Sequence, residues 1–165
     1  MRVMALADTH VRPGAKPQLP EVVYDALTGI DVVLHAGDVI SRDLLLELSA
    51  FAPVHAVLGN NDHELVGVLP ETLTTVLEGV HIGMVHEPGP RAGRTSRLRR
   101  RFPESDLVVF GHTHEPCDDV GLDGQRLFNP GSPTQRRRAP YRSYGLLELH
   151  DGTIASHRIV EITAT

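Results

Sequence analysis

The N-terminal third of the chain alternates three apolar, β-branched runs with two stretches of helical spacing. The apolar runs are Val3–Ala7, Val32–Ala36 and Val54–Leu58, and the stretches between them are Glu21–Leu27 and Arg42–Ala50. Short apolar runs predict buried strands, and strands that alternate with helices predict a parallel sheet with right-handed crossovers. This βαβαβ pattern indicates the α/β class.

The second expected helix has one apolar face. Leu44, Leu45, Leu48 and Phe51 recur at spacings of three and four residues, which predicts that they pack together against the sheet. Ser41, directly before the helix, is a good N-cap residue because its hydroxyl can accept a hydrogen bond from a free backbone N–H.

The remainder of the chain is rich in strand and turn signals. Leu73–Leu77 and Val80–Val85 are apolar runs joined by Glu78 and Gly79, a basic helix is expected at Arg94–Arg101, and Leu107–Phe110 is a further strand. The dipeptides Asp123-Gly124 and Asp151-Gly152 lie between apolar runs and predict β-hairpins. We therefore expect an antiparallel C-terminal third.

These elements predict a four-layer α/β/β/α sandwich of two packed mixed β-sheets flanked by helices. One sheet would continue the parallel half and the other would be built from the hairpins. A length of 165 residues fits one domain, and we expect residues 1–165 to form it. Aromatic residues make up only 4% of the chain, so the core must come from aliphatic side chains, and a base-stacking surface for nucleic acid is not expected.

Polar side chains that bind metals follow five of the expected strands. They are Asp8, His10, Asp38, Asn60, His86, His112 and His114. Because ligands bind outside the carboxyl ends of strands in open α/β sheets, these side chains can converge on one place. Carboxylate oxygen and imidazole nitrogen without sulfur suit Mn, Fe, Zn or Ni. The set predicts a two-metal hydrolytic centre, in which Asp38 can bridge the ions through its two oxygens.

The order of these motifs, Asp-x-His, Gly-Asp, Gly-Asn-x-Asp, a His, then Gly-His-x-His, closely resembles the calcineurin-like metallophosphoesterase superfamily over nearly the whole chain. Within it, Gly111 to Pro116 followed by Asn129-Pro130-Gly131-Ser132 is similar to the small prokaryotic phosphodiesterase branch, which is related to a retromer subunit. The resemblance implies two divalent metal ions, with Mn as the first choice and Ni, Zn or Fe as alternatives. It assigns Asp8, His10, Asp38 and His114 to the first ion, and Asp38, Asn60, His86 and His112 to the second.

One position departs from the superfamily pattern. Where most members have a histidine after the Gly-Asn pair, this chain has Asn61, and an amide cannot act as a general acid. Asn61 can donate a hydrogen bond to a phosphoryl oxygen, Asp62 can orient nearby groups, and His63 is the nearest candidate acid. We place Asn61 and His63 as candidate catalytic residues, and we expect activated phosphodiesters to be better substrates than alkyl monoesters. Glu87 is a second departure, because relatives commonly have Gly there.

The expected function is hydrolysis of phosphodiester bonds by a metal-bound hydroxide. The alternative is a metal-binding, catalytically weak protein-interaction scaffold of the same fold. A nuclease or nucleic-acid-repair phosphatase is favoured only by two runs of arginine, within 97–101 and at 136–138, and the net charge of −5 opposes it. In the loop from Asn129 to Arg138, Arg136 is the first choice for a contact with the phosphate of a substrate.

The expected partner is a small phosphodiester substrate rather than nucleic acid or a membrane, and a homo-oligomer stays open. No apolar stretch is long enough to span a bilayer, Asp8 leaves little room for a cleavable signal, and Cys117 is the single cysteine. We expect a cytoplasmic protein.

Overall fold

The computed structural model describes residues 1–16 and 18–163, which form two five-stranded sheets. The first sheet has the order β10-β9-β1-β2-β3. Its strands are β1 (Arg2–Leu6), β2 (Val32–His35), β3 (Val54–Ala56), β9 (Arg142–His150) and β10 (Thr153–Ile162). β1, β2 and β3 are parallel, and β9 pairs antiparallel with β1. The expected parallel half is therefore confirmed.

The second sheet has the order β4-β5-β6-β8-β7. Its strands are β4 (Thr72–Leu77), β5 (Val80–Val85), β6 (Leu107–Phe110), β7 (Cys117–Val120) and β8 (Arg126–Asn129). β5, β6 and β8 are parallel, whereas β4 and β7 are antiparallel to their neighbours. Both sheets are thus mixed, as expected.

The expected distribution of the hairpins was wrong. The β9–β10 hairpin, which turns at Asp151 and Gly152, extends the first sheet, while the β7–β8 hairpin extends the second, where β8 is parallel to β6. Both Asp151 and Gly152 have positive φ (45° and 75°), the conformation of the two-residue hairpin turn that their sequence predicts. Turn residues determine pairing within a hairpin, but they carry no information about which sheet edge the hairpin joins.

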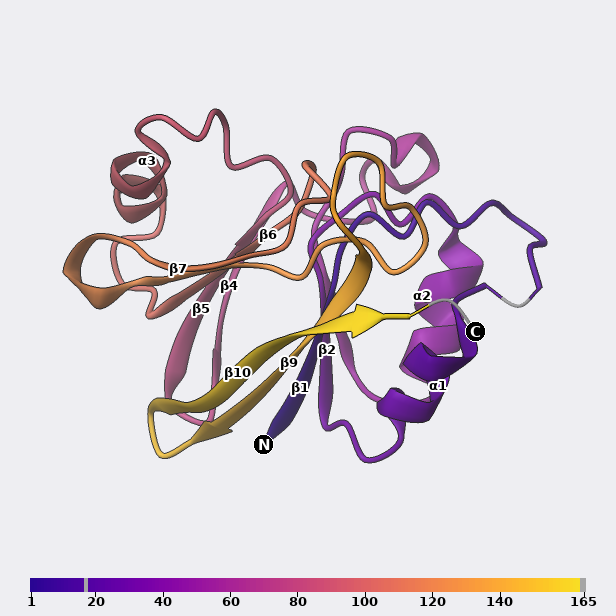
Figure 1. The fold of residues 1–165 in the computed structure, drawn as a ribbon, viewed down its shortest axis with the longest axis horizontal. Coiled ribbons are helices and arrows are strands. Elements are labelled where there is room, and N and C mark those ends of the chain that lie inside the picture. Colours follow the sequence, from indigo (N-terminus) through magenta and orange to yellow (C-terminus); the bar gives the residue numbers. More distant parts are fainter. Residues whose placement is uncertain (17, 164–165) are drawn as a thin grey trace.

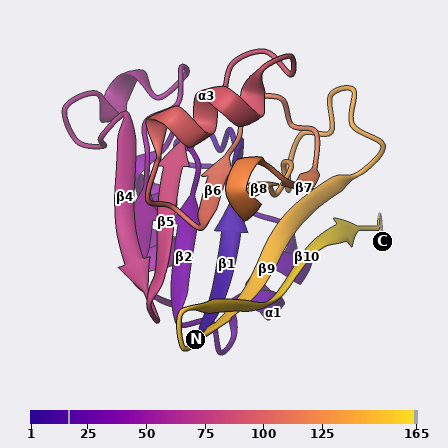
Figure 2. The ribbon, with the colours of Figure 1, turned by 90° about the vertical axis from the view of Figure 1, so that its left-hand side faces the viewer.

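Helices cover the outer faces of both sheets (Figure 1). α1 (Glu21–Leu27) and α2 (Arg42–Ser49) lie on the first sheet, and α3 (Arg94–Arg101) lies on the second. Figure 2 shows α3 running across β5 and β6. The four-layer sandwich is confirmed. Two short 3₁₀ helices, η1 (His63–Leu65) and η2 (Leu122–Gly124), lie in the connections.

The α2 helix begins as its sequence predicts, because the Ser41 hydroxyl accepts a hydrogen bond from the Asp43 backbone N–H at 3.1 Å. Leu44 and Leu48 are fully buried against the first sheet. Phe51 was expected on the same face but is 45% exposed. The helix ends at Ser49, so helical spacing does not extend to Phe51.

An aliphatic core between the sheets aligns their parallel strands. Val3 and Leu34 from the first sheet belong to the same buried cluster as Met84 and Val109 from the second. As a result, the carboxyl ends of β1, β2, β3, β5 and β6 meet at one edge of the sandwich, at the top of Figure 1. Among residues 1–16 and 18–163, no helix combines the length and hydrophobicity needed to cross a membrane.

Candidate metal centre

The segments that follow the five strands bring metal-binding side chains together between the two sheets. Two groups of residues each bring their donor atoms within 4.8 Å of one another. The first group is Asp8, His10 and His114, and the second is Asp8, Asp38 and His86. Asn60 and His112 lie beside the second group, as the hydrogen-bond geometry below shows. All seven residues expected from the sequence therefore lie in one cluster.

The first group is built around Asp8. The His114 Nε2 atom lies 3.4 Å from Asp8 Oδ1, and the Nε2 atoms of His10 and His114 are 3.2 Å apart. His10 Nε2 also lies 3.4 Å from Asp38 Oδ2. Three imidazole and carboxylate donors from two strand ends thus point to a common position.

The second group is built around Asn60 and His86. The Asn60 Oδ1 atom lies 3.0 Å from both His86 Nε2 and His112 Nδ1. His86 Nε2 lies 3.5 Å from Asp38 Oδ2, the same oxygen that faces His10 in the first group. Asp38 therefore stands between the two groups, where a bridging ligand would lie.

Asp8 is the clearest sign that the cluster fits a cation. The residue is completely buried, and neither of its carboxylate oxygens has a hydrogen-bond partner among the described residues. Burial raises the pKa of Asp8 to about 7, against the nearby His86, which lowers it. A buried carboxylate without partners is costly. A divalent ion would provide the missing charge and ligand bonds.

Two of the histidines are oriented through Nδ1. His86 Nδ1 lies 2.8 Å from the Ala36 carbonyl and His114 Nδ1 lies 2.7 Å from the Gln135 carbonyl. Because a carbonyl only accepts, each Nδ1 carries a proton, and Nε2 is the ring nitrogen that faces the cluster and can bind an ion. Burial also lowers the pKa of His114 to about 4, which keeps its ring neutral. Both rings are therefore prepared to be metal ligands.

Asn61 and Asp62 fix the position of Asp38. Asn61 donates to Asp38 twice, from its backbone N–H to Oδ1 at 2.9 Å and from its side-chain amide to Oδ2 at 2.7 Å. Burial acts to raise the pKa of Asp38, but hydrogen bonds from His86 and Asn61 outweigh it and hold that pKa well below its usual range. The buried Asp62 carboxylate accepts from the backbone N–H groups of Asp38 and Gly59 at 2.9 and 2.7 Å. Asp62 thus joins the loops that follow β2 and β3.

The other residues singled out in the sequence lie at the periphery. His63 is exposed at the start of η1 and, within the part of the chain that the structure describes, makes no hydrogen bond to the cluster. Glu87 is exposed, and Arg136 donates to the Pro140 carbonyl at 3.2 Å. The arginine that acts on the cluster is Arg137. Burial lowers the pKa of both His10 and His114, and the positive charge of Arg137 lowers it further.

Two hydroxyl groups support the centre in a way that sequence reasoning missed. Ser132 Oγ donates to the Asp8 carbonyl at 2.7 Å, and Thr134 Oγ1 donates to the Thr9 carbonyl at 2.6 Å. Both contacts hold the Asp8-x-His10 segment against a loop more than 120 residues away. The Asn129–Ser132 motif marked this loop in the sequence, but nothing local to it indicated its partner.

The backbone is strained at most of the expected ligands. Five of these seven residues have φ between 45° and 71°: Asp8, His10, Asp38, His112 and His114. Positive φ is uncommon outside glycine, and such residues cluster at functional sites because the surrounding structure must hold them there.

Glycines let these segments come close together. A Cβ atom on Gly59 would lie 2.2 Å from Asp38 Oδ1, and one on Gly111 would lie 2.9 Å from Asp8 Oδ2. Neither has positive φ, so at these two positions glycine is required for space rather than for conformation.

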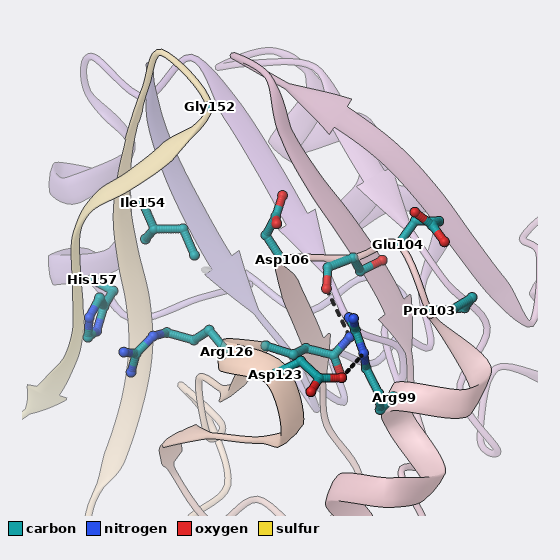
Figure 3. Close-up of a pocket in the computed structure, with 12 residues that line it drawn as sticks. Arg99, Pro103, Glu104, Asp106, Asp123, Arg126, Gly152, Ile154 and His157 are labelled. Atoms are coloured by element: carbon teal, nitrogen blue, oxygen red, sulfur yellow. Dashed lines mark hydrogen bonds and ion pairs between the residues drawn. The ribbon is translucent and has the colours of Figure 1, made fainter.

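One polar pocket lies away from this centre. A pocket of about 480 Å³ lies beside Asp106, which precedes β6, whereas His112 and His114 follow the other end of that strand. Figure 3 shows its polar walls, where Arg99 and Asp123 form an ion pair with 3.1 Å between Nε and Oδ2. None of the seven expected ligands lines this pocket.

Comparisons with known proteins agree with the geometry. The model of the calcineurin-like phosphoesterase superfamily domain matches residues 1–152. A probable metallophosphoesterase of Methanothermobacter thermautotrophicus is 39% identical over 140 residues, which cover 83% of this chain and 80% of the relative. A second probable metallophosphoesterase, from Methanocaldococcus jannaschii, is 34% identical over 158 residues and 92% of this chain, with 77% of the relative covered.

Among solved structures, the chain is similar to Vps29 of Entamoeba histolytica in complex with zinc. The TM-score is 0.76 at 25% identity, and the match covers 98% of both chains.

Proposed function

The chain belongs to the calcineurin-like phosphoesterase superfamily, and on this premise we propose that it is a phosphodiesterase with a dinuclear metal centre. Membership in the family indicates a hydrolase that acts on phosphoric esters. The observation that carries the finer proposal is the completely buried Asp8 carboxylate, which has no hydrogen-bond partner among the described residues and is surrounded by imidazole nitrogens.

The donor set fits two divalent ions. Asp8, His10, Asp38 and His114 would hold the first, and Asp38, Asn60, His86 and His112 would hold the second. Such a pair, when bound, supplies an acidified water as nucleophile and positive charge for the phosphoryl oxygens. Mn is our first choice, and the zinc in the Vps29 neighbour is consistent with Zn as an alternative.

The surroundings of Asp38 support a preference for diesters with good leaving groups. Asn61 uses its amide to hold Asp38, and His63 is exposed and away from the cluster's hydrogen bonds within the described residues. Neither is placed to give a proton to the leaving oxygen. Hydrolysis should therefore depend on leaving groups that depart without protonation, which favours activated phosphodiesters over alkyl monoesters.

The competing proposal is a metal-binding, catalytically weak protein-interaction scaffold of the same fold. It is favoured by the similarity to Vps29 over nearly the whole chain. Against it, all seven ligand-type side chains are retained in one cluster, whereas loss of chemistry would be expected to remove some of them.

The test is titration of Mn into chelator-treated protein while hydrolysis of bis-p-nitrophenyl phosphate is followed. We expect saturable turnover that Asp38→Asn abolishes, with the fold of the variant checked by circular dichroism. Exposed Asp43 provides the control, and Asp43→Asn should keep full turnover. Absence of turnover with Mn, Ni, Zn and Fe would reject the phosphodiesterase and favour the scaffold.

A further inference from the structure

A second pocket, of about 470 Å³, opens between the start of α3 and strand β7. Thr113, which lies between the proposed ligands His112 and His114, lines this pocket together with Arg91 and Arg94. Through Thr113, the pocket borders the segment that carries two of the metal ligands.

Arg94 is a partly buried cation with no acidic partner among the described residues. Its guanidinium lies 5.2 Å from the centre of the Phe110 ring, and its Nε atom is buried with no hydrogen-bond partner in the same part of the chain. The guanidinium makes one long hydrogen bond to the described residues, from Nη2 to the Gly89 carbonyl at 3.4 Å. A buried donor left unpaired in a protein is destabilising, and more so when it is charged. Such a group is expected to have a partner that comes from outside the chain.

Arg91 is exposed and likewise has no ion pair within the described part of the chain. The lack of an ion pair among the described residues distinguishes Arg91 and Arg94 from two other arginines near the second sheet. Arg99 pairs with Asp123 at 3.1 Å, and Arg126 pairs with Asp118 at 2.6 Å.

Three acidic residues line the pocket, and two of them, Asp118 and Asp119, are already engaged, while the third, Glu115, is exposed and has no ion pair among the described residues. The Asp118 carboxylate contacts Arg126 and His157, each at 2.6 Å. Asp119 accepts a hydrogen bond from the Cys117 thiol at 3.2 Å. Burial raises the pKa of Cys117 to about 12, and the charges of Arg94 and Arg91 act against this rise, so both guanidinium groups lie near the pocket wall that holds Cys117.

The α3 helix adds to the positive character of this end. It begins without a side-chain cap and has no acidic residue in its first turn, and Thr95 of that turn lines the pocket. The N-terminal end of a helix favours anions. Two unpaired guanidinium groups, a hydroxyl and an open helix end thus face one cavity beside the metal centre.

We propose that Arg91 and Arg94 bind a second phosphate group of the substrate. The preferred substrates are then phosphodiesters that carry a further phosphate beyond the one that is hydrolysed. Arginine suits this role because its planar donors match phosphate oxygens in pairs. The inference rests on the proposed phosphodiesterase function and deepens it.

The experiment compares two dinucleotides that differ by one group, thymidylyl-thymidine with and without a 5′-phosphate. We expect the wild-type protein to prefer the phosphorylated form by about tenfold in kcat/KM, mainly through KM, which corresponds to about 1.4 kcal/mol. Arg91→Gln and Arg94→Gln should each reduce the ratio toward one. Arg99→Gln, on the same helix but paired with Asp123, is the matched control and should keep the wild-type ratio.

A second readout does not depend on turnover. Isothermal titration of the two dinucleotides into chelator-treated protein should show tighter binding of the phosphorylated form by wild type, and loss of that difference in the Arg91 variant. Because Arg91 is exposed, this variant serves even if Arg94→Gln fails to fold.

The inference would be overturned if wild type had the same kcat/KM for both dinucleotides, or if the preference for the phosphorylated form survived in both arginine variants. The proposed function would stand in that case, because bis-p-nitrophenyl phosphate has no second phosphate and reports on the metal centre alone. If wild type hydrolyses neither that ester nor the dinucleotides, the proposed function itself fails.

Discussion

Asn61 holds Asp38 with two hydrogen bonds, from its backbone N–H at 2.9 Å and from its side-chain amide at 2.7 Å. The residue that occupies the position of the superfamily histidine is therefore committed to the carboxylate between the two ligand groups. In this structure its amide orients Asp38, one of the expected metal ligands, while its contact with a phosphoryl oxygen stays a prediction.

This relationship predicts the effect of Asn61→Ala. The backbone hydrogen bond remains but the amide is lost, and removal of such an outer partner typically weakens metal binding 10- to 100-fold. We expect the Mn concentration for half-maximal activity to rise by about this factor, with smaller changes in kcat at saturating Mn. Asn61→Gln is too long to restore the contact at the same geometry and should resemble Ala. An unchanged Mn requirement would show that the amide does not position Asp38.

The burial of Asp8 predicts that the metal-free protein becomes less stable as the pH rises. Its pKa is raised to about 7 in the folded state from 3.8 in the unfolded state, so the folded state holds this proton more tightly. Stability from this group is fully present below pH 3.8 and is lost as the pH rises to about 7. We expect Asp8→Asn to raise the melting temperature of the metal-free protein at pH 8 and to have little effect at pH 4, measured by calorimetry. A variant that melts lower than wild type at pH 8 would contradict this.

The same shift predicts that metal binding displaces a proton. Below pH 7 Asp8 is largely protonated and must release that proton to become a ligand, whereas at pH 8 it is already ionised. Calorimetric titration with Mn in two buffers of different ionisation enthalpy should therefore show one more proton released at pH 6 than at pH 8 from this site. Asp8→Asn should reduce that difference, and His86, whose pKa is raised because its hydrogen bond to Asp38 outweighs the effect of burial, should account for the rest. Equal proton release by wild type at both pH values would count against a protonated Asp8.

Local patterns in the sequence were sufficient for most elements. The bounds expected for the helix at Glu21–Leu27, the helix at Arg94–Arg101 and the strand at Val80–Val85 are those of the structure. The clustering of the seven expected ligands also follows from local order, because each follows an apolar run and parallel strands end at one edge.

What the sequence could not provide depends on contacts between distant segments. Nothing near Asp151 indicates that its hairpin extends the first sheet, and nothing near Ser132 indicates that its hydroxyl reaches the Asp8 carbonyl. The sequence pattern shows only that Asn61 stands where most members of the superfamily have a histidine. Its contact with Asp38 depends on the folding of two separate loops and appears only in the structure.

The exposed position of His63 predicts that it does not protonate the leaving oxygen. Because this residue is exposed and p-nitrophenolate leaves without protonation, His63→Gln should keep kcat/KM for bis-p-nitrophenyl phosphate within about twofold of wild type. For the wild type, kcat/KM should fall steeply as the pKa of the leaving phenol increases across a series of aryl diesters. A shallow dependence in wild type that becomes steep in His63→Gln would assign the proton donor to His63.

The hydrogen bonds of Asp62 predict a large loss of stability when this residue, which is not a proposed ligand, is truncated. Its carboxylate is buried and accepts from three backbone N–H groups, those of Asp38, Ile40 and Gly59, at 2.9, 2.7 and 2.7 Å. Asp62→Ala leaves these donors unpaired at the point where the loops after β2 and β3 meet. Since each unsatisfied buried group costs about 1–3 kcal/mol, the free energy of unfolding should fall by roughly 3 kcal/mol or more.

The Mn requirement of Asp62→Ala should rise as well, because Asp38 and Asn60 lie on the two loops that Asp62 joins. Asp62→Asn keeps one acceptor oxygen and should lie between Ala and wild type in urea denaturation. Exposed Glu64, two residues further along the same loop, gives the matched control, and Glu64→Ala should unfold at the wild-type urea concentration. If Asp62→Ala and Glu64→Ala proved equally stable, the Asp62 carboxylate would not be what holds the two ligand loops together.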